Sequence, residues 1–226
     1  MIESKLMLEA VSVTSARWWS LFYLYLAVAL AASAFFVIWI IYLVVSTRPR
    51  KGRPETNQIK PGVIPSSTRG NAKVVLYLVV FLAIVFYGLF FYTLPTSYYL
   101  KNVPSNTNGD LNITVYAAQW TWTFKYPNGY NVTTNALHPS TIRFPTNTTI
   151  VFKVTSEDVM HEFSIPAFDV KVDAYPGVWN SAWTEVTVPG TYQVFCTELC
   201  GIQHADMWSY MQFVNQSSFQ TWISSH

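Results

Sequence analysis

Two long runs of apolar residues dominate the first hundred positions. Residues 21–45 read LFYLYLAVALAASAFFVIWIIYLVV and residues 74–95 read VVLYLVVFLAIVFYGLFFYTLP, and neither run contains a charged residue. A helix needs about 20 apolar residues to cross the hydrocarbon core of a membrane. We therefore predict two transmembrane helices, over residues 21–45 and 74–96. A buried core helix is the alternative. A signal peptide fits the first run poorly, because the run is too long and no small-residue cleavage site follows it.

The stretch between the two runs, residues 46–73, is polar and rich in Pro, Gly and Ser, which indicates a loop. It carries one acid, Glu55, and seven basic residues: Arg48, Arg50, Lys51, Arg53, Lys60, Arg69 and Lys73. Such an excess of positive charge marks the cytoplasmic side of a membrane protein. We therefore expect a two-pass protein of the cell membrane. Its first segment, residues 1–20, and everything from residue 97 onward would lie outside the cytoplasm.

From residue 97 the pattern changes to short runs rich in β-branched and aromatic residues. Turn signals such as PNG at 127–129 and PG at 189–190 separate most of them. The runs predict strands over residues 112–118, 121–126, 149–155, 183–188, 191–197 and 207–214. Many short strands with no helical period between them favour an all-β, Greek-key sandwich over residues 97–226.

The predicted external domain differs from the loop in charge. It holds nine acidic and five basic residues, a net charge of minus four. We expect membrane lipid and no nucleic acid among the partners of the chain. Four Asn-X-Ser/Thr sequences occur, all in this domain, and are candidate glycosylation sites: Asn112, Asn131, Asn147 and Asn215.

The only two cysteines, Cys196 and Cys200, lie in the segment FCTELCGIQHADM. Outside the cytoplasm, a cysteine pair predicts a disulfide by default. However, His204 and Met207 follow on the same loop, and His161 comes shortly after the predicted strand 149–155. Together these side chains form a soft nitrogen-and-sulfur donor set. Zinc is one candidate, but methionine is not a usual zinc ligand. Two cysteines that bridge two metal ions, with the other donors completing each ion, describe a binuclear copper centre.

The pattern C-x-E-x-C-x3-H-x2-M, with DVMHEF upstream, resembles the CuA site of subunit II of haem-copper terminal oxidases of the cytochrome c type. The resemblance extends to AAQWTWTFKYP at 117–127 and SEDVMHEFSIPAFDVKVDAYPG at 156–177, and to the order of two helices followed by an external domain. It therefore covers nearly the whole chain. It implies a cupredoxin fold for the sandwich.

The resemblance also implies a ligand set. Cys196 and Cys200 would bridge two copper ions, and His161 and His204 would each bind one ion. Met207 would supply an axial thioether, and Glu198 an axial backbone carbonyl. In the family the carboxylate that corresponds to Glu198 reaches a magnesium ion at the border with subunit I. Asp173 would lie near that ion, and the alternative for Asp173 is a turn-capping carboxylate.

Three further residues take roles from the same resemblance. Trp120 matches the family's tryptophan for electron input, exposed above the copper centre; core packing is its alternative, and is what we expect of Trp122 and Tyr126. Glu157 and Asp158 stand where the family has acidic docking residues, which would steer a basic donor protein. Ordinary solvation is the alternative for these two acids.

The resemblance implies an electron-transfer subunit of an oxidase complex. It would accept electrons from an external donor, a cytochrome c or a small blue copper protein, and pass them to haem in subunit I. Oxygen reduction coupled to proton translocation would take place there, and the chain alone would be no catalyst. Two alternatives stay open: a CuA subunit of a nitric oxide reductase, and a membrane-anchored structural sandwich with a Cys196–Cys200 disulfide.

The chain departs from the family pattern in places. Val178 replaces an arginine that contacts the haem-bearing subunit, and NAKVVLYLVVF lacks a glutamate of the proton channel, so we assign the chain no proton role. His138 and His226 match no ligand position. The sparse charge and the sequons would suit an acidic exterior such as that of an archaeon.

Overall fold

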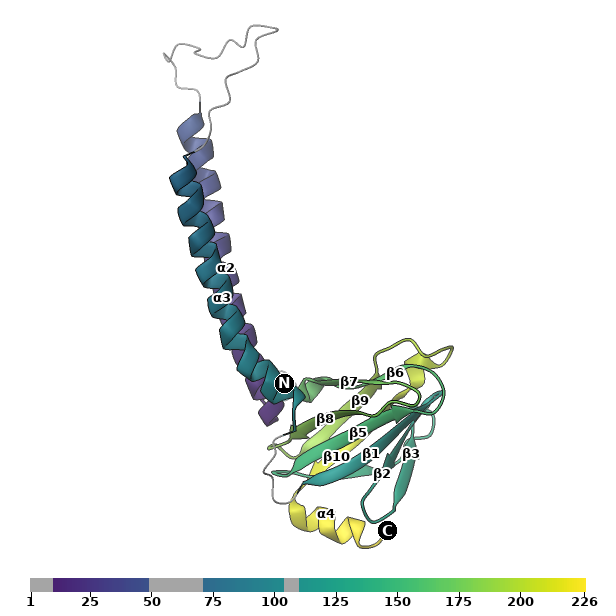
Figure 1. Ribbon diagram of the computed structural model, residues 1–226. Coiled ribbons are helices and arrows are strands. Elements are labelled where there is room, and N and C mark those ends of the chain that lie inside the picture. The colour runs from purple at the N-terminus through teal and green to yellow at the C-terminus, as the bar shows by residue number, and fades with distance from the viewer. Residues whose placement is uncertain (1–9, 49–70, 104–109) are drawn as a thin grey trace, which may run out of the picture. The chain divides into compact units, whose positions relative to one another are not determined.

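The computed structural model describes residues 10–48, 71–103 and 110–226. Two long helices, α2 (Val13–Thr47) and α3 (Ala72–Lys101), precede a β-sandwich (Figure 1). Two compact units make up the described chain. One is residues 22–94, which hold most of both helices. The other is the sandwich together with the first residues of α2 and the last residues of α3.

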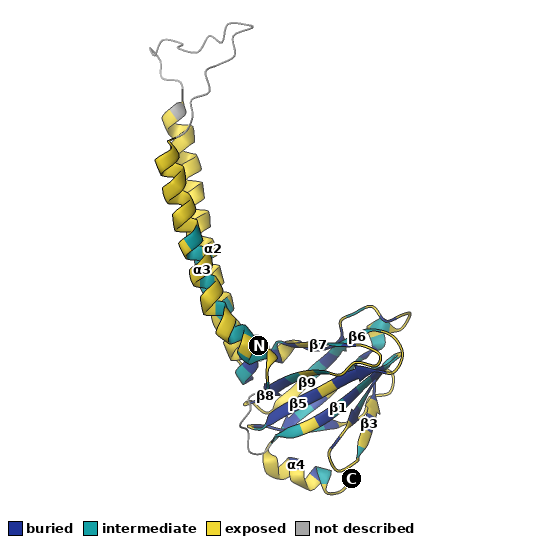
Figure 2. Cartoon of the chain, viewed as in Figure 1, coloured by how far each residue is buried: buried dark blue, intermediate teal, exposed yellow. Residues whose placement is uncertain are grey.

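The helical unit is apolar on all sides. Its large side chains are exposed, as Figure 2 shows by colour; Ile38 is 66% exposed and Phe91 65%. A helix that is hydrophobic all round needs an apolar surrounding, and both helices are long and apolar enough to cross a membrane. The hydroxyls of Tyr25 on α2 and Thr93 on α3 lie 2.8 Å apart and form a hydrogen bond between the helices.

The helices extend beyond the apolar runs from which they were predicted. α2 begins at Val13 rather than at residue 21, and α3 continues to Lys101, past Pro95. The helical backbone satisfies its own hydrogen bonds, so it does not have to end where the apolar side chains end. Most of the basic loop predicted over residues 46–73 lies outside the described residues.

Within residues 110–226 the strands form two five-stranded sheets, which confirms the predicted sandwich. The first has the order β3-β2-β1-β5-β8, with β1 (Leu111–Ala118), β2 (Thr121–Lys125), β3 (Asn131–Thr134), β5 (Thr149–Ser156) and β8 (Asn180–Glu185). The second has the order β4-β10-β9-β6-β7, with β4 (Ile142–Pro145), β6 (His161–Ile165), β7 (Val170–Ala174), β9 (Gly190–Cys196) and β10 (Trp208–Val214). Each sheet is mixed, because β1 pairs with β5, and β10 with β4, in parallel.

Five of the predicted strands agree with β1, β2, β5, β9 and β10 to within one residue at each end. The strand predicted over 183–188 is wrong in position, because the pairing of β8 with β5 begins at Asn180 and stops at Glu185. The prediction missed β3, β4, β6 and β7, which have four or five residues each. It also missed the helix α4 (Gln216–Ile223), although Asn215 caps it by accepting a hydrogen bond from the Ser218 amide.

Aromatic side chains fill the space between the sheets. The inward positions alternate along β1 and β2, as expected of strands with one buried face. Phe163 on β6 contacts Phe152 at 5.2 Å between ring centroids and Trp122 at 5.3 Å. Trp122 and Tyr126 are buried, which confirms that they pack in the core.

The residues at the start of α2 belong to this core as well. Ser12 forms a β-bridge with Val186, and the Thr187 amide donates to the Val11 carbonyl at 3.0 Å. The Thr14 hydroxyl donates to the Phe168 carbonyl at 2.7 Å and lies 2.9 Å from the Thr184 hydroxyl. Val11, Ser12, Thr14 and Ser15 are buried, so the segment 11–15 is a part of the sandwich.

Thr14→Val should destabilise the sandwich unit. The change keeps the side-chain shape but leaves the buried Phe168 carbonyl and Thr184 hydroxyl without their partner, which costs about 1–3 kcal/mol. Urea unfolding of the full chain in detergent, followed by tryptophan fluorescence, measures the loss. Ser20→Ala is the matched control: Ser20 is exposed, and its hydroxyl donates to the Arg17 carbonyl of its own helix. Coincident curves for all three proteins would contradict the anchoring role.

Candidate metal centre

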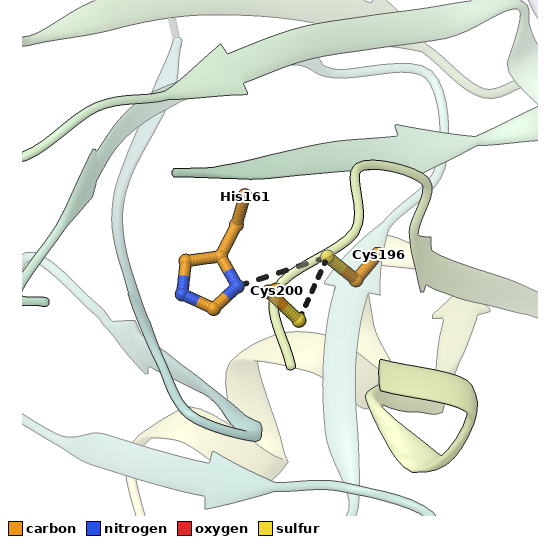
Figure 3. Close-up of side chains that lie close together, drawn as sticks. All are labelled: His161, Cys196 and Cys200. Atoms are coloured by element: carbon orange, nitrogen blue, oxygen red, sulfur yellow. Dashed lines mark hydrogen bonds between the residues drawn. The ribbon is translucent and has the colours of Figure 1, made fainter. Parts of the chain in front are cut away.

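The pairing of β6 with β9 brings the first two candidate ligands together. His161 opens β6 and Cys196 ends β9, and in the antiparallel pairing Cys196 lies opposite Phe163. The Thr197 amide continues the ladder with a 3.1 Å bond to the Glu162 carbonyl. In Figure 3 the His161 ring turns towards Cys196, whose sulfur lies between the ring and Cys200. His161 Nδ1 is 3.7 Å from Cys196 Sγ.

The loop after β9 carries the other candidate ligands and is closed by a 2.9 Å bond from the Cys196 amide to the Met207 carbonyl. Within it, the Cys200 sulfur lies 3.4 Å from His204 Nδ1 and 3.8 Å from Met207 Sδ. The Glu198 carbonyl oxygen is 3.2 Å from Cys196 Sγ. The structure therefore brings together all six residues that the sequence singled out as ligands.

The two sulfurs are the centre of this arrangement. They are 3.7 Å apart, well beyond the S–S bond length of about 2.05 Å, and both cysteines are free thiols. The remaining donors divide between them: His161 and the Glu198 carbonyl contact Cys196, and His204 and Met207 contact Cys200. A single tetrahedral zinc site would leave donors unused. The soft donors fit copper.

The surroundings of the two thiols give them different pKa values. Burial works to raise the pKa of Cys196, but hydrogen bonds with His161 and with backbone groups outweigh it and lower that pKa to about 7. For Cys200, burial and the neighbouring Cys196 charge raise the pKa to about 12. Burial would lower the pKa of His161, yet its hydrogen bonds with Cys196 and Asp158 raise it. Without metal, the site therefore carries its first negative charge on Cys196.

Asp158 contacts the site directly, which the sequence did not suggest. Its carboxylate lies 2.9 Å from His161 Nε2, on the side of the ring away from Cys196, and so orients the imidazole. It also accepts a 2.7 Å bond from the Gln119 amide. Burial raises the pKa of Asp158, but the bonds with His161 and Gln119 outweigh this effect and lower it. The D-x-x-H spacing was the available signal; for Gln119 the sequence offered none.

The other predicted site residues lie around the loop. Trp120 is half-buried and packs against the core, with its indole close to Gly201. Glu157 is exposed. Asp173 lies opposite Glu162 in the β6–β7 pair and accepts a 3.3 Å bond from the Tyr175 hydroxyl. Asp173, Glu162 and Glu198 together raise the pKa of Tyr175, so the three carboxylates share one electrostatic environment.

The remaining residues of interest lie apart from the sulfurs. His226 packs on the rings of Tyr130 and Trp222, at 4.5 and 5.0 Å. His138 is exposed. All four asparagines of the candidate glycosylation sites are exposed as well: Asn112, Asn131, Asn147 and Asn215.

Comparison with known proteins gives consistent results. The family model described as "Cytochrome C oxidase subunit II, periplasmic domain" matches residues 111–214. The "Heme-copper oxidase subunit 2" of Aeropyrum pernix is 33% identical over 213 residues, covering 91% of this chain and 88% of that protein. A "Probable cytochrome c oxidase subunit 2" of Rickettsia prowazekii is 36% identical over 131 residues, 51% of this chain and 42% of that relative.

A solved structure resembles the sandwich. The crystal structure of the periplasmic domain of subunit II of cytochrome oxidase from Bradyrhizobium japonicum matches with a TM-score of 0.51 and 31% sequence identity. The match covers 55% of this chain and 96% of that domain.

The order of thiol ionisation can be measured on the metal-free, reduced full chain. During brief exposure to iodoacetamide, Cys196 should be alkylated first, because only the thiolate reacts and Cys196 has the lower pKa. Both thiols are buried, so burial alone does not favour one of them. Its rate should rise as the pH passes through about 7 and then level off, while Cys200 stays unreactive. Peptide mapping assigns the label. The control is the urea-unfolded chain, in which both thiols have a pKa of about 8.5. Preferential labelling of Cys200 would contradict the assignment.

Proposed function

The chain belongs to the family of subunit II of haem-copper terminal oxidases, the electron-input subunit of these complexes, and we propose that its sulfur pair holds a binuclear copper centre of the CuA type. The bridging ligands would be Cys196 and Cys200, and His161 and His204 would each bind one ion. Met207 and the Glu198 carbonyl would complete the set. Bound copper would supply a one-electron carrier between an external donor and the haem of subunit I.

One observation carries this proposal: two unbonded sulfurs 3.7 Å apart, each with its own nitrogen donor and its own weaker donor. A disulfide would need the sulfurs to bond, and a structural zinc site would need no methionine. One nitrogen donor and one weaker donor for each ion is what two metal ions sharing both thiolates require.

The protein itself supplies rigidity and exclusion of water. His161 and Met207 are 0% and 1% exposed, and Trp122 lies against the site, with its indole N–H donating to the Met207 carbonyl at 3.3 Å. Ligands held by two paired strands and a closed loop change position little when the charge of the site changes. Such restraint favours fast electron transfer, because little of the surroundings must reorganise.

The chain is a membrane protein with an extracytoplasmic domain, and we infer its finer topology from charge. The helical spans would be residues 21–45 and 74–96, with the basic loop of residues 46–73 in the cytoplasm. Both termini and the copper domain would lie outside the cell membrane. The exposed asparagines of the four Asn-X-Ser/Thr sites would then be accessible for glycosylation.

Partners follow from the positions of the remaining residues. Trp120 would receive the electron from a cytochrome c or a blue copper protein, and the exposed Glu157 would attract a basic donor. Glu198 and Asp173 would border a magnesium ion at the contact with subunit I. Their support is that both carboxylates act on Tyr175 and raise its pKa, while the neighbouring Glu162 is ion-paired with Lys171 at 2.9 Å.

Copper loading of the full chain in detergent tests the proposal. The wild type should bind two copper ions per chain and give an EPR spectrum in which one unpaired electron couples to two copper nuclei. Cys200→Ser removes one bridge and should abolish that coupling. Gln203→Ala, an exposed position on the same loop, is the matched control and should leave the spectrum unchanged. A wild-type chain that binds one copper ion, or that keeps a Cys196–Cys200 disulfide after reduction, would rule out the proposed centre.

A further inference from the structure

Gln119 forms hydrogen bonds with two parts of the metal site, the loop that carries Cys200 and the Asp158 carboxylate beside His161. Its side-chain amide donates to the Cys200 carbonyl at 2.7 Å, and its backbone amide donates to the Asp158 carboxylate at 2.7 Å. The first contact holds the loop that carries Cys200. The second holds the carboxylate that orients His161. Only the first contact depends on the identity of the side chain, because the second is made by a backbone amide.

Asp158 links Gln119 to His161, one of the proposed metal ligands. Its two carboxylate oxygens take different partners: Oδ2 accepts from the Gln119 amide and Oδ1 lies 2.9 Å from His161 Nε2. The main chain of residue 119 is therefore joined to the imidazole by two consecutive hydrogen bonds. Charge-assisted bonds of this kind are shorter and stronger than neutral ones, and they fix geometry.

Trp120, the next residue, adds contacts of its own to the same part of the domain. Its carbonyl accepts a 3.1 Å bond from the Asn135 side chain, and its indole lies against Gly201. A Cβ at Gly201 would lie 3.0 Å from the Gln119 side-chain nitrogen and 3.2 Å from the Trp120 indole nitrogen. The glycine, with φ of +127°, thus lets the indole and the Gln119 amide approach the backbone between Cys200 and the loop tip.

We propose that Gln119 is a positioning residue that holds Trp120 in register with both halves of the copper site. The inference rests on the proposed function, since it gives Trp120 the role of receiving the electron. The step that it supports moves one electron: the donor is oxidised by one electron, the copper site is reduced by one, no covalent bond changes and no proton is transferred. Gln119 itself is neither oxidised nor reduced.

The first experiment needs no metal. Hydrogen exchange of the reduced, metal-free full chain in detergent is compared by mass spectrometry for wild type, Gln119→Leu and Gln119→Glu, which keep the size of the side chain but remove its N–H donor. Loss of one hydrogen bond, worth about 1 kcal/mol, should speed exchange about fivefold in peptides covering residues 118–122 and 197–203. Gln193→Leu on β9 is the matched control, since the side-chain amide of Gln193 makes no hydrogen bond among the described residues. Unchanged exchange at both peptides would overturn the proposal.

The second experiment separates positioning from general stability. Copper-loaded full chains are mixed with hexaammineruthenium(II), a one-electron outer-sphere reductant, and bleaching of the visible absorption is timed. Gln119→Leu should slow reduction as Trp120→Phe does, with the absorption spectrum of the wild type retained. A slower reaction accompanied by an altered spectrum would mean a merely structural role.

The two possible failures differ in their results. If Trp120→Phe slows reduction and both Gln119 variants react at the wild-type rate, the inference about Gln119 is wrong and the proposed function stands. If Trp120→Phe is also reduced at the wild-type rate, electron input through Trp120 is wrong, and the role of Gln119 fails with it. A chain that never takes up two copper ions would instead defeat the proposed centre.

Discussion

The antiparallel pairing of β6 with β9 is the constraint on which the site depends. It places His161 beside Cys196 although 35 residues separate them in the chain. Once these two are fixed, the loop after β9 needs only the bond from the Cys196 amide to the Met207 carbonyl to return Cys200, His204 and Met207 to the same point. The aromatic core beneath, with Phe163 packed on Trp122, keeps that strand pair from shifting.

Burial disfavours the ionised form of both cysteine thiols, and this affects how the site takes up metal. A thiolate removed from water is unfavourable unless it is hydrogen-bonded or bound to a metal. His161 and backbone groups already hold the pKa of Cys196 low, while burial and the charge of Cys196 keep the pKa of Cys200 high. In the metal-free chain, Cys196 therefore ionises at a much lower pH than Cys200. Both thiols would ionise only when cations compensate them, which couples proton release to metal uptake.

Sequence reasoning found what local composition determines. The apolar runs gave the helices, and five strands followed from their β-branched and aromatic content. The donors near Cys196 were found because they recur at short spacing on one loop and match the CuA pattern. What it missed is set by tertiary pairing: β6 and β7 are short and depend on their neighbours, and the contact of Asp158 with Gln119 joins residues 39 positions apart. The resemblance suggested Asp158 as a docking residue, and it did not suggest that the carboxylate also contacts the buried imidazole of His161.

The segment 11–15 has a consequence for how the domain can be studied in isolation. Its Val11 carbonyl accepts a hydrogen bond from the Thr187 amide, and its Thr14 hydroxyl bonds with the Phe168 carbonyl and the Thr184 hydroxyl. All three partners come after both helices in the sequence. A water-soluble fragment that starts after α3 would leave Val186 without its bridge partner and the Phe168 carbonyl and Thr184 hydroxyl unpaired. Such a fragment would be less stable than the complete sandwich unit. A better design joins residues 10–16 to the sandwich through a short polar linker and omits only the lipid-facing parts of the two helices.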